Sequence, residues 1–532
     1  MRPEIVILGA RVIDGTGAPW FCADVAVAGG VIIDIGRIGP VEGAENVDGA
    51  GLCLSPGFVD IHSHSDTVTL IDGRAAAKVM QGVTTEVVGV CGSSAAPLGG
   101  KDSPEAKDVA TALAAFGKEL DWASVSEYLS GIEAAGTSVN IATLVGHGTL
   151  RNGVIGRDMR PATPGDVAKM AGLLDGALQD GAFGLSSGLE YPPGFFADVN
   201  ELAGVARPLA RRGGMYASHI RNEDETLMES IQEAIAVGRL AGVPVEISHL
   251  KVIGPLYWGK VRDALREIEK AREEGVDVAA DAYPYTASST SLGIVLPDWA
   301  HSGGREATVR RLMDPGACAK IKEIASKGTE MLGGWSLIVV TSVKSPKNRI
   351  YEGRNLDEIA QHMGLEACDA AFKLLVEEEM QVSIVRHGMS EEDVACVLAS
   401  PLVSFCSDGR ALAADGPLRQ GTVHPRNFGA FARAIAKYVR DDRVLRLEEA
   451  VRKMTSLPAS RVRLARRGLV KAGFFADLVL FSLPDIRDTA TYLEPWQYPS
   501  GIEGVWTNGV RVVRAGRHTG SMPGRALRMG RV

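Results

Sequence analysis

The sequence predicts an α/β protein: a (β/α)8 TIM-like barrel together with a small β-sandwich formed by both chain termini. Three observations lead to this fold class. Apolar, strand-like runs alternate with helical stretches through the middle of the chain, eight such runs can be distinguished, and both ends are rich in short β-like segments. Alternation of this kind is typical of a parallel sheet whose two faces are covered by helices.

The eight predicted strands share a near-continuous apolar character and end close to polar residues. They are 58–64, 83–91, 139–147, 182–188, 215–220, 244–250, 278–283 and 402–408. Helical segments such as "DETLMESIQEAIAVGRLAG" lie between them. Eight units favour a closed barrel, whose active site lies at the C-terminal ends of the strands. A doubly wound sheet is the competing fold, but no glycine-rich dinucleotide loop supports it.

Three regions divide the chain. Residues 1–54 and 460–532 contain short β-rich runs joined by turn signals such as "TNG", so we expect each to supply part of the β-sandwich. Residues 55–459 form the predicted barrel. About 110 residues separate "DAYPYTASST" from "FCSDGRALAADG", which is too long for a simple connection, and an insertion is therefore expected at about 286–398.

Charge and composition exclude several classes of partner. The net charge of −8 disfavours nucleic acid and anionic membrane surfaces, because both require a basic face. No apolar stretch approaches the length of a membrane span, and the first residues lack the pattern of a signal peptide. Seven scattered cysteines, an odd number, suit the reducing cytoplasm better than a disulfide framework.

The segment "SPGFVDIHSHSD" places two histidines at the end of the first predicted barrel strand. Residues i and i+2 of a strand face the same side, so His62 and His64 are expected to point together into the mouth of the barrel. Taken alone, such a pair is as consistent with ordinary hydrogen bonding as with metal binding.

Other strand ends strengthen the metal interpretation. The second, fifth, sixth and eighth strands end near Cys91, His219, His249 and Asp408, and Lys251 follows His249 on the same face. Thiolate, imidazole and carboxylate are the groups that bind zinc in proteins. Their shared position at the ends of barrel strands is difficult to explain by packing, so we predict a metal site there.

A series of motifs along the chain resembles a known protein family. The motifs "PGFVDIHSHSD", "GVTTEVVGVCG", "VGHGTLR", "GLSSGLEYPPG", "SHIRNEDE", "ISHLK", "DAYPYTASSTSL", "SDGRALAADGPL" and "HPRNFGAFARAI" occur in this order over nearly the whole chain. Together they resemble the amidohydrolase superfamily, and within it the N-acyl-D-amino-acid deacylase (D-aminoacylase) family. The resemblance implies zinc-dependent hydrolysis of the amide bond of N-acyl-D-amino acids, small molecules that yield a carboxylate and a free D-amino acid.

The resemblance also implies a ligand set. One tightly held zinc ion is expected at Cys91, His219 and His249, and a second, weaker site at His62, His64 and Asp408. Many binuclear relatives bridge two metals with a carboxylated lysine on the fourth strand, but "GAFGLSSGLEY" has no lysine. Whether the weaker site is filled stays open.

Roles for the remaining residues follow from the same resemblance. Asp408 is expected to accept the proton of the attacking water and pass it to the leaving amine. Lys251, Tyr283 and Arg426 are expected to bind the carboxylate of the amino acid. His147 and Ser187 are expected to line the substrate site, although His147 could equally be a structural histidine. Glu190 is expected in the pocket wall, while Asp66 and Asp281 are expected to orient the ligands.

Three alternatives are considered. A cyclic-amide hydrolase of the hydantoinase or dihydropyrimidinase type has the same scaffold, but such enzymes usually carry the fourth-strand lysine. A non-catalytic metal-binding barrel is the second. A deaminase would need a glutamate beside the fifth-strand histidine, and the acids of "SHIRNEDE" look exposed. The side-chain and acyl preference of the substrate, the strictness for D over L, and the oligomeric state are left open.

Overall fold

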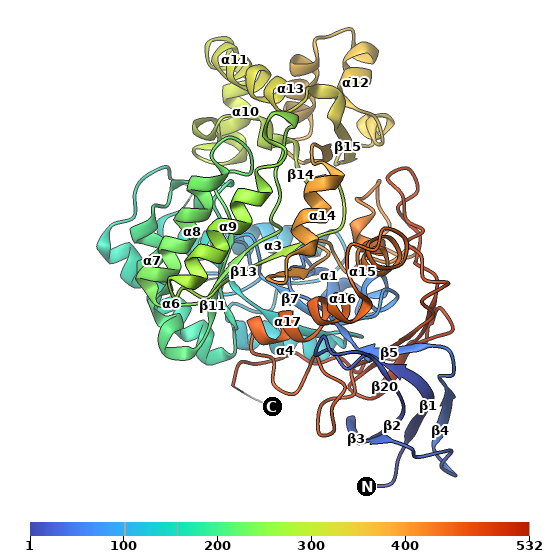
Figure 1. Ribbon diagram of the computed structural model, residues 1–532. Coiled ribbons are helices and arrows are strands. Elements are labelled where there is room, and N and C mark those ends of the chain that lie inside the picture. Colours follow the sequence, from blue (N-terminus) through green and yellow to red (C-terminus); the bar gives the residue numbers. More distant parts are fainter. Residues whose placement is uncertain (101–102, 157, 531–532) are drawn as a thin grey trace.

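A closed barrel of parallel strands forms the centre of the protein (Figure 1). The computed structural model describes residues 1–100, 103–156 and 158–530. The barrel strands are β6 (Phe58–Asp60), β7 (Val83–Val88), β8 (Asn140–Thr143) with its continuation β9 (Val145–Gly146), β10 (Gly184–Gly188), β11 (Met215–His219), β12 (Val245–Ile247), β13 (Val278–Ala282) and β17 (Val403–Phe405). Each pairs in parallel with the next, and a parallel bridge from Ser63 to Gly409 closes the ring. The predicted barrel is confirmed.

Helices cover the outside of the barrel between successive strands. They are α1 (Val68–Ile71), α2 (Ala76–Val79), α3 (Pro104–Ala114), α4 (Val125–Ala135), α5 (His147–Ile155), α6 (Pro164–Asp180), α7 (Val199–Arg212), α8 (Leu227–Ala241), α9 (Val261–Glu273), α14 (Glu391–Ala399), α15 (Arg426–Ile435) with a π-helical continuation (Ala436–Asp441), α16 (Leu447–Met454) and α17 (Ser456–Arg461).

The helix α9 shows how the local sequence dictates this packing. Val261, Ala264, Ile268 and Ala271 recur three or four residues apart and are all buried, while the charged residues between them face water. This spacing produces one apolar stripe along an α-helix. The stripe packs against β13, and the helix lies beside α8 and α14.

Both termini contribute to one nine-stranded sheet beside the barrel. Its strands are β1 (Ile5–Val12), β2 (Phe21–Ala28), β3 (Val31–Gly36), β4 (Glu45–Asp48), β5 (Cys53–Pro56), β18 (Leu478–Phe481), β19 (Ile502–Thr507), β20 (Val510–Arg514) and β21 (Arg517–His518). The two ends of the chain meet where β5 pairs antiparallel with β18, and the blue and red strands lie together in Figure 1. Beyond β21 the chain returns to the barrel, where Ala526 bridges Ile141 of β8.

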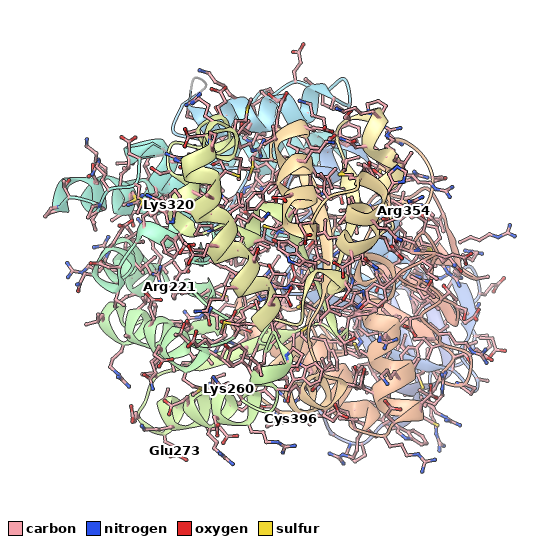
Figure 2. All side chains as sticks on the ribbon, turned by 90° about the horizontal axis from the view of Figure 1, so that it is seen from above. Arg221, Lys260, Glu273, Lys320, Arg354 and Cys396 are labelled. Carbon is pink, nitrogen blue, oxygen red and sulfur yellow. The ribbon has the colours of Figure 1, made fainter. Side chains whose placement is uncertain are left out.

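The insertion forms a separate layer above the barrel (Figure 1). It contains an antiparallel sheet and four α-helices: β14 (Ala287–Ser291), β15 (Ile338–Val343), β16 (Val382–His387), α10 (Arg305–Met313), α11 (Pro315–Met331), α12 (Leu356–Met363) and α13 (Ala367–Glu377). Its apolar residues form a core of their own. Seen from above, α11 with Lys320 and the segment at Arg354 lie over the barrel (Figure 2).

The end of the insertion differs from the predicted limit at residue 398. The separate core ends with β16 at His387, whereas α14 buries Val394, Val397 and Leu398 in the core of the barrel. A helix before the last strand completes the alternation of strands and helices, so α14 belongs to the barrel. Among the described residues, no helix is both long enough and apolar enough to cross a membrane.

Candidate metal centre and active site

Side chains from five barrel strands converge at one end of the barrel. Cys91 follows β7, His219 ends β11, His249 follows β12, His62 follows β6 and Asp408 follows β17. The Sγ atom of Cys91 lies 3.2 Å from Nε2 of His62 and 3.4 Å from Nε2 of His249. The imidazole rings of His219 and His249 have centroids 4.4 Å apart. His62 and Asp408, 346 positions apart along the chain, therefore share one small volume with the other three residues.

The convergent groups offer overlapping sets of three metal ligands. In each set the donor atoms lie within 4.8 Å of one another, and the sets are Cys91–His219–His249, His62–His249–Asp408 and His62–His64–Cys91. His62, His219 and His249 are buried, and so is Asp408. Nδ1 of His219 is buried and finds no hydrogen-bond partner in the part of the chain that the structure describes, as expected of a group whose partner is a metal ion. A thiolate with two imidazoles fits tetrahedral zinc with one position left for water.

Three of these residues have unusual backbone conformations. The φ angles are +51° for Cys91, +36° for His249 and +49° for Asp408, all in the left-handed region that side chains other than glycine rarely adopt. Such conformations persist where the surrounding structure enforces them, and they cluster at functional sites. At each strand end the chain turns sharply and aims the side chain toward the barrel axis.

The charges of the cluster favour a cation at its centre. Burial opposes ionisation of the Cys91 thiol, but attraction by His62 and His249 outweighs it and brings the pKa well below the ordinary value. Burial also opposes ionisation of Asp408, yet the Arg426 guanidinium and the neighbouring imidazoles hold its pKa well below the usual range. The Asp408 carboxyl is therefore anionic at neutral pH, and the surrounding imidazoles favour the thiolate form of Cys91.

Carboxylates behind the cluster orient the histidines. Oδ1 of Asp281 accepts a hydrogen bond of 2.8 Å from the backbone N–H of His249 and lies 3.4 Å from Nδ1 of His62. Oε2 of Glu190 lies 2.8 Å from Nε2 of His219. Carboxylate partners of this kind fix the ring orientation of metal-binding histidines.

The burial of Glu223 differs from the exposure expected from the sequence. The acids of "SHIRNEDE" look exposed in the sequence, but Glu223 is only 4% exposed. Its Oε1 atom lies 2.5 Å from Nζ of Lys251 and 3.2 Å from Nδ1 of His249. Glu223 comes four residues after His219, at the end of a barrel strand. This position is the sequence signal that could have indicated its burial at the site.

The three residues predicted to bind the substrate carboxylate lie together beside the cluster. Nη1 of Arg426 lies 2.7 Å from Oδ2 of Asp408. The centroid of the Tyr283 ring lies 4.9 Å from the guanidinium carbon of Arg426 and 5.7 Å from Nζ of Lys251. The hydroxyl of Tyr283 is buried and has no hydrogen-bond partner among the described residues, so it is available to a ligand.

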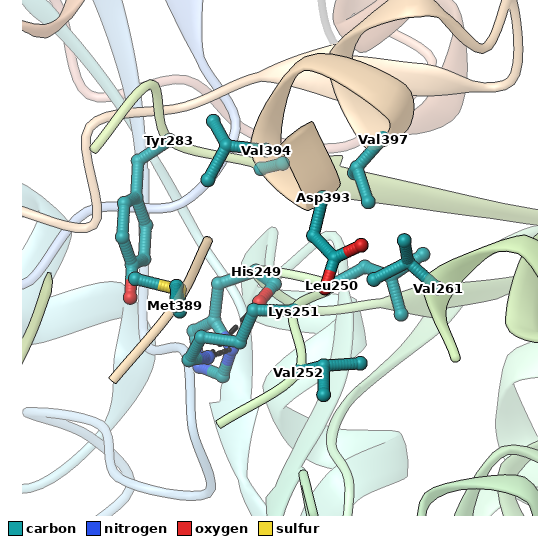
Figure 3. Close-up of a pocket in the computed structure, with 11 residues that line it drawn as sticks. His249, Leu250, Lys251, Val252, Val261, Tyr283, Met389, Asp393, Val394 and Val397 are labelled. Atoms are coloured by element: carbon teal, nitrogen blue, oxygen red, sulfur yellow. Dashed lines mark hydrogen bonds between the residues drawn. The ribbon is translucent and has the colours of Figure 1, made fainter. Parts of the chain in front are cut away.

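A mainly apolar pocket opens next to this group (Figure 3). Its lining includes His249, Lys251 and Tyr283 together with Met389, Val394 and Val397. Figure 3 marks the hydrogen bond between Lys251 and His249, whose Nζ and Nδ1 atoms are 2.7 Å apart. The pocket wall thus joins the barrel strands to helix α14.

The other predicted residues occupy different positions. Nε2 of His64 lies 3.0 Å from Oδ1 of Asp408, within the cluster. His147, the first residue of α5, is fully buried and lies 3.0 Å from Oε1 of Glu201 on α7, so its contacts are structural and its role at the substrate stays a prediction. Oγ of Ser187 lies 2.7 Å from the Tyr216 hydroxyl inside the barrel.

Asp66 is half-buried close to the cluster. Desolvation raises the pKa of its carboxyl to about 6, despite the attraction of the neighbouring His64 imidazole. Its backbone carbonyl accepts a hydrogen bond of 2.6 Å from the hydroxyl of Tyr128 on α4. This bond joins the loop after the histidine pair to the outer helices.

A buried ionic network lies beneath the histidine pair and is not evident from the sequence. Nζ of Lys78 on α2 lies 2.7 Å from Oδ2 of Asp60 and 2.9 Å from Oε1 of Glu86, and it donates a hydrogen bond of 2.7 Å to Oγ of Ser407. Oδ1 of Asp60 accepts a bond of 2.9 Å from the backbone N–H of Ser407. The network therefore joins the strand that carries His62 to the segment that carries Asp408.

Comparison with known proteins agrees with this geometry. The profile of the amidohydrolase family matches residues 45–281 and 409–513. The chain is 35% identical to the D-aminoacylase of Alcaligenes xylosoxydans xylosoxydans over 98% of this chain and 97% of that protein, and 34% identical to the N-acyl-D-aspartate deacylase of the same organism over 99% and 96%. The solved structure of N-acyl-D-glutamate deacylase from Bordetella bronchiseptica, complexed with zinc and a phosphonate inhibitor, superposes with a TM-score of 0.84 at 34% identity, covering 99% of this chain and 100% of that one. The chain therefore belongs to the amidohydrolase family, as a metal-dependent enzyme of its D-aminoacylase branch.

Proposed function

We propose that the protein is a zinc-dependent hydrolase that cleaves the amide bond of N-acyl-D-amino acids. The convergence of Cys91, His219 and His249 carries this proposal, because a thiolate and two imidazoles at the open end of a barrel are suited to one zinc ion with a free coordination position. The names of the relatives, which are deacylases of D-amino acids, point to the same reaction.

We assign the tight zinc site to Cys91, His219 and His249, and a weaker site to His62, His64 and Asp408. The sets overlap in space, since His62 lies 3.2 Å from the sulfur of Cys91. Bound zinc supplies Lewis-acid activation of water and of the scissile carbonyl group. Asp281 beside the His62 imidazole and Glu190 beside the His219 imidazole hold these rings in place for this task.

Asp408 is the proton carrier of the proposed reaction. Its carboxylate is ionised, buried, and directed at the histidine pair. It accepts the proton of the attacking water, and it then donates that proton to the nitrogen of the leaving amine as the carbon–nitrogen bond breaks. The ion pair with Arg426 keeps the carboxylate oriented between these two steps.

Lys251, Tyr283 and Arg426 are proposed to hold the carboxylate of the amino acid. Two cations and an unpartnered phenol surround one side of the cluster, and a planar guanidinium binds a carboxylate with two parallel hydrogen bonds. When the carboxylate and the scissile amide of the substrate are both held, the substrate side chain can point in only one direction for each enantiomer. The enantiomer whose side chain points toward the pocket is the one accepted.

The seven thiols suit a reducing compartment, and we propose the cytoplasm as the location of the enzyme. The substrate is a small molecule. A role for nucleic acid is disfavoured by the net charge of −8.

A substrate panel with metal analysis tests the function. Zinc-loaded protein should hydrolyse N-acetyl-D-amino acids, leave the L-enantiomers largely intact, and act poorly on hydantoins and dihydropyrimidines. Asp408→Asn should retain zinc and lower kcat by about 10²- to 10⁴-fold, the usual contribution of a positioned acid–base group.

Other outcomes of this panel would favour the alternatives. Preferential cleavage of hydantoin would indicate a cyclic-amide hydrolase. Zinc binding without cleavage of any amide, or full turnover by Asp408→Asn, would indicate a metal-binding barrel without the proposed chemistry.

A further inference from the structure

The loop that leads to Arg426 is bound by the insertion at its far end. Arg426 is the first residue of α15, and residues 406–425 form a long loop between β17 and that helix. A loop of this length does not fix the position of its last residues unless other parts of the fold bind them. The position of the Arg426 guanidinium therefore depends on what the end of the loop contacts.

Three residues at the end of this loop, spaced two apart, bind the insertion sheet. Thr422 donates hydrogen bonds of 2.9 Å and 3.0 Å, from its backbone N–H and its hydroxyl, to one carbonyl oxygen of β15. Nε2 of His424 lies 2.9 Å from the backbone oxygen of Ala287 on β14. Nη2 of Arg426 donates a longer bond of 3.4 Å to the backbone oxygen of Ser289 on the same strand. The insertion therefore supplies hydrogen-bond acceptors that hold the end of the loop.

His424 uses both ring nitrogens in this arrangement. Its Nδ1 atom accepts a hydrogen bond of 3.0 Å from the backbone N–H of Arg426. That N–H belongs to the first turn of α15, where the helix itself offers no acceptor. Because a carbonyl oxygen can only accept, Nε2 carries the proton toward Ala287, and the unprotonated Nδ1 faces the N–H group. One neutral tautomer of the imidazole therefore joins β14 to the start of α15.

The surroundings of His424 keep the imidazole in this place. The residue is only 2% exposed, and its ring centroid lies 5.2 Å from that of Tyr285 and 5.1 Å from that of Tyr492. Burial, and then the positive charge of Arg426, hold the pKa of His424 well below its ordinary value. The ring is therefore a neutral, tightly packed spacer between the insertion and the helix.

The position of Arg426 matters because its guanidinium faces the active site. Nη1 lies 2.7 Å from Oδ2 of Asp408, and the guanidinium carbon lies 4.9 Å from the centroid of the Tyr283 ring. A guanidinium binds a carboxylate through two parallel N–H groups, which requires a defined orientation. Small displacements of such positioned groups strongly weaken their contacts with a substrate. A shift of the first turn of α15 is therefore felt at the site proposed for the substrate carboxylate.

We propose that His424 is a positioning residue for Arg426, and that through it the insertion fixes the site that binds the carboxylate of the substrate. This inference rests on the proposed function. Because His424 acts through Arg426, its loss should weaken substrate binding more than it slows the chemical step. The insertion is then the support that keeps an arginine of the barrel in its binding position.

Substitutions at His424 separate its two hydrogen bonds. The amide nitrogen of His424→Gln can occupy the position of Nε2 and keep the bond to Ala287, whereas His424→Asn is too short to reach that oxygen. On zinc-loaded protein, His424→Asn should raise KM for the best N-acetyl-D-amino acid by about tenfold and change kcat less than about threefold. His424→Gln should keep KM within about threefold of the wild type. His424→Phe keeps the ring packing but loses both bonds, so it should behave like His424→Asn.

A double-mutant cycle shows whether the effect passes through the arginine. In an Arg426→Met background, His424→Asn should change KM less than about twofold, because the group that it positions is already absent. Calorimetric binding of the substrate replaces KM if turnover of the Arg426→Met protein is too slow to follow. His362→Asn is the matched control, since it removes an exposed histidine from the insertion and should leave kcat and KM unchanged. Zinc content and circular dichroism identify variants that fail to fold, and His424→Phe replaces His424→Asn in that case.

Several outcomes would overturn the inference while leaving the proposed hydrolase intact. They are an equal rise of KM in both backgrounds, a lower kcat at unchanged KM in His424→Asn, and an equal rise of KM for His424→Gln and His424→Asn. The last result would show that the bond to the insertion contributes nothing to substrate binding. Absence of turnover on every N-acyl-D-amino acid by zinc-loaded protein would overturn the proposed function and this inference together.

Discussion

Replacing Lys78 by methionine should destabilise the barrel and loosen the ends of the strands that carry the metal centre. The Lys78 ammonium is completely buried between Asp60 and Glu86, at 2.7 Å and 2.9 Å, and it also donates a bond to Ser407. The methionine side chain fills most of the same volume, so the change removes charge more than packing.

The magnitude follows from the loss of a buried counterion. Removing one partner of a buried ion pair costs about 3–5 kcal/mol, because the remaining charge stays desolvated. Here two carboxylates lose the same cation, so the free energy of unfolding should fall by at least about 4 kcal/mol. For a cooperative unit of roughly 400 residues, this corresponds to a fall in Tm of about 5 °C.

Thermal melts of zinc-free protein measure this effect without the contribution of the metal. Lys169→Met is the control, since Lys169 is exposed on α6 and its loss should change stability by less than about 0.5 kcal/mol. The double variant Lys78→Met/Glu86→Gln should be more stable than Lys78→Met alone, because one buried carboxylate is then neutral. A Tm for Lys78→Met within 1 °C of the wild type, or a double variant less stable than the single one, would refute the reasoning.

Three further outcomes are expected. Cys91→Ala should lower zinc affinity by about 100-fold or more, because thiolate is a strong zinc ligand, and equilibrium dialysis with metal analysis measures this loss. His147→Gln should lower Tm, because it weakens the buried contact with Glu201, while KM stays unchanged; a raised KM at an unchanged Tm would instead place His147 at the substrate. Burial lowers the pKa of Lys453 from the ordinary 10.5 to about 7 in the folded state. Between these two pH values the unfolded state therefore binds more protons than the folded state. The free energy of unfolding should rise with pH across this window. Urea unfolding between pH 7 and 10 should show this rise in the wild type and a flatter profile in Lys453→Met, and equal slopes in the two proteins would contradict it.

The strand ends were predictable from the sequence because their signals are local. Short apolar runs of four to eight residues, each ending in a potential metal ligand, indicate the carboxyl edge of a parallel barrel. The ligands are His62, Cys91, His219, His249 and Asp408. This indication does not depend on the conformation of the loops between the strands. The period of two in a strand then directs each side chain inward.

The surrounding charges could not be predicted in the same way. Lys78 and Glu86 lie on different elements, and their contact depends on how α2 packs against β7. The placement of side chains on the insertion sheet depends on the fold of the whole insertion, because its paired strands are up to about 100 residues apart. The pairing of Arg426 with Asp408 likewise arises from the loop between them, for which residue type alone gives no geometry.

X-ray absorption at the zinc edge of the purified, active protein tests the central claim most directly. The account predicts one sulfur ligand at about 2.3 Å and imidazole nitrogens at about 2.0–2.1 Å, with hydrolysis of an N-acetyl-D-amino acid rising in proportion to bound zinc until one equivalent is reached. A zinc ion without a sulfur ligand, or full activity in protein from which all metal has been removed, would contradict it.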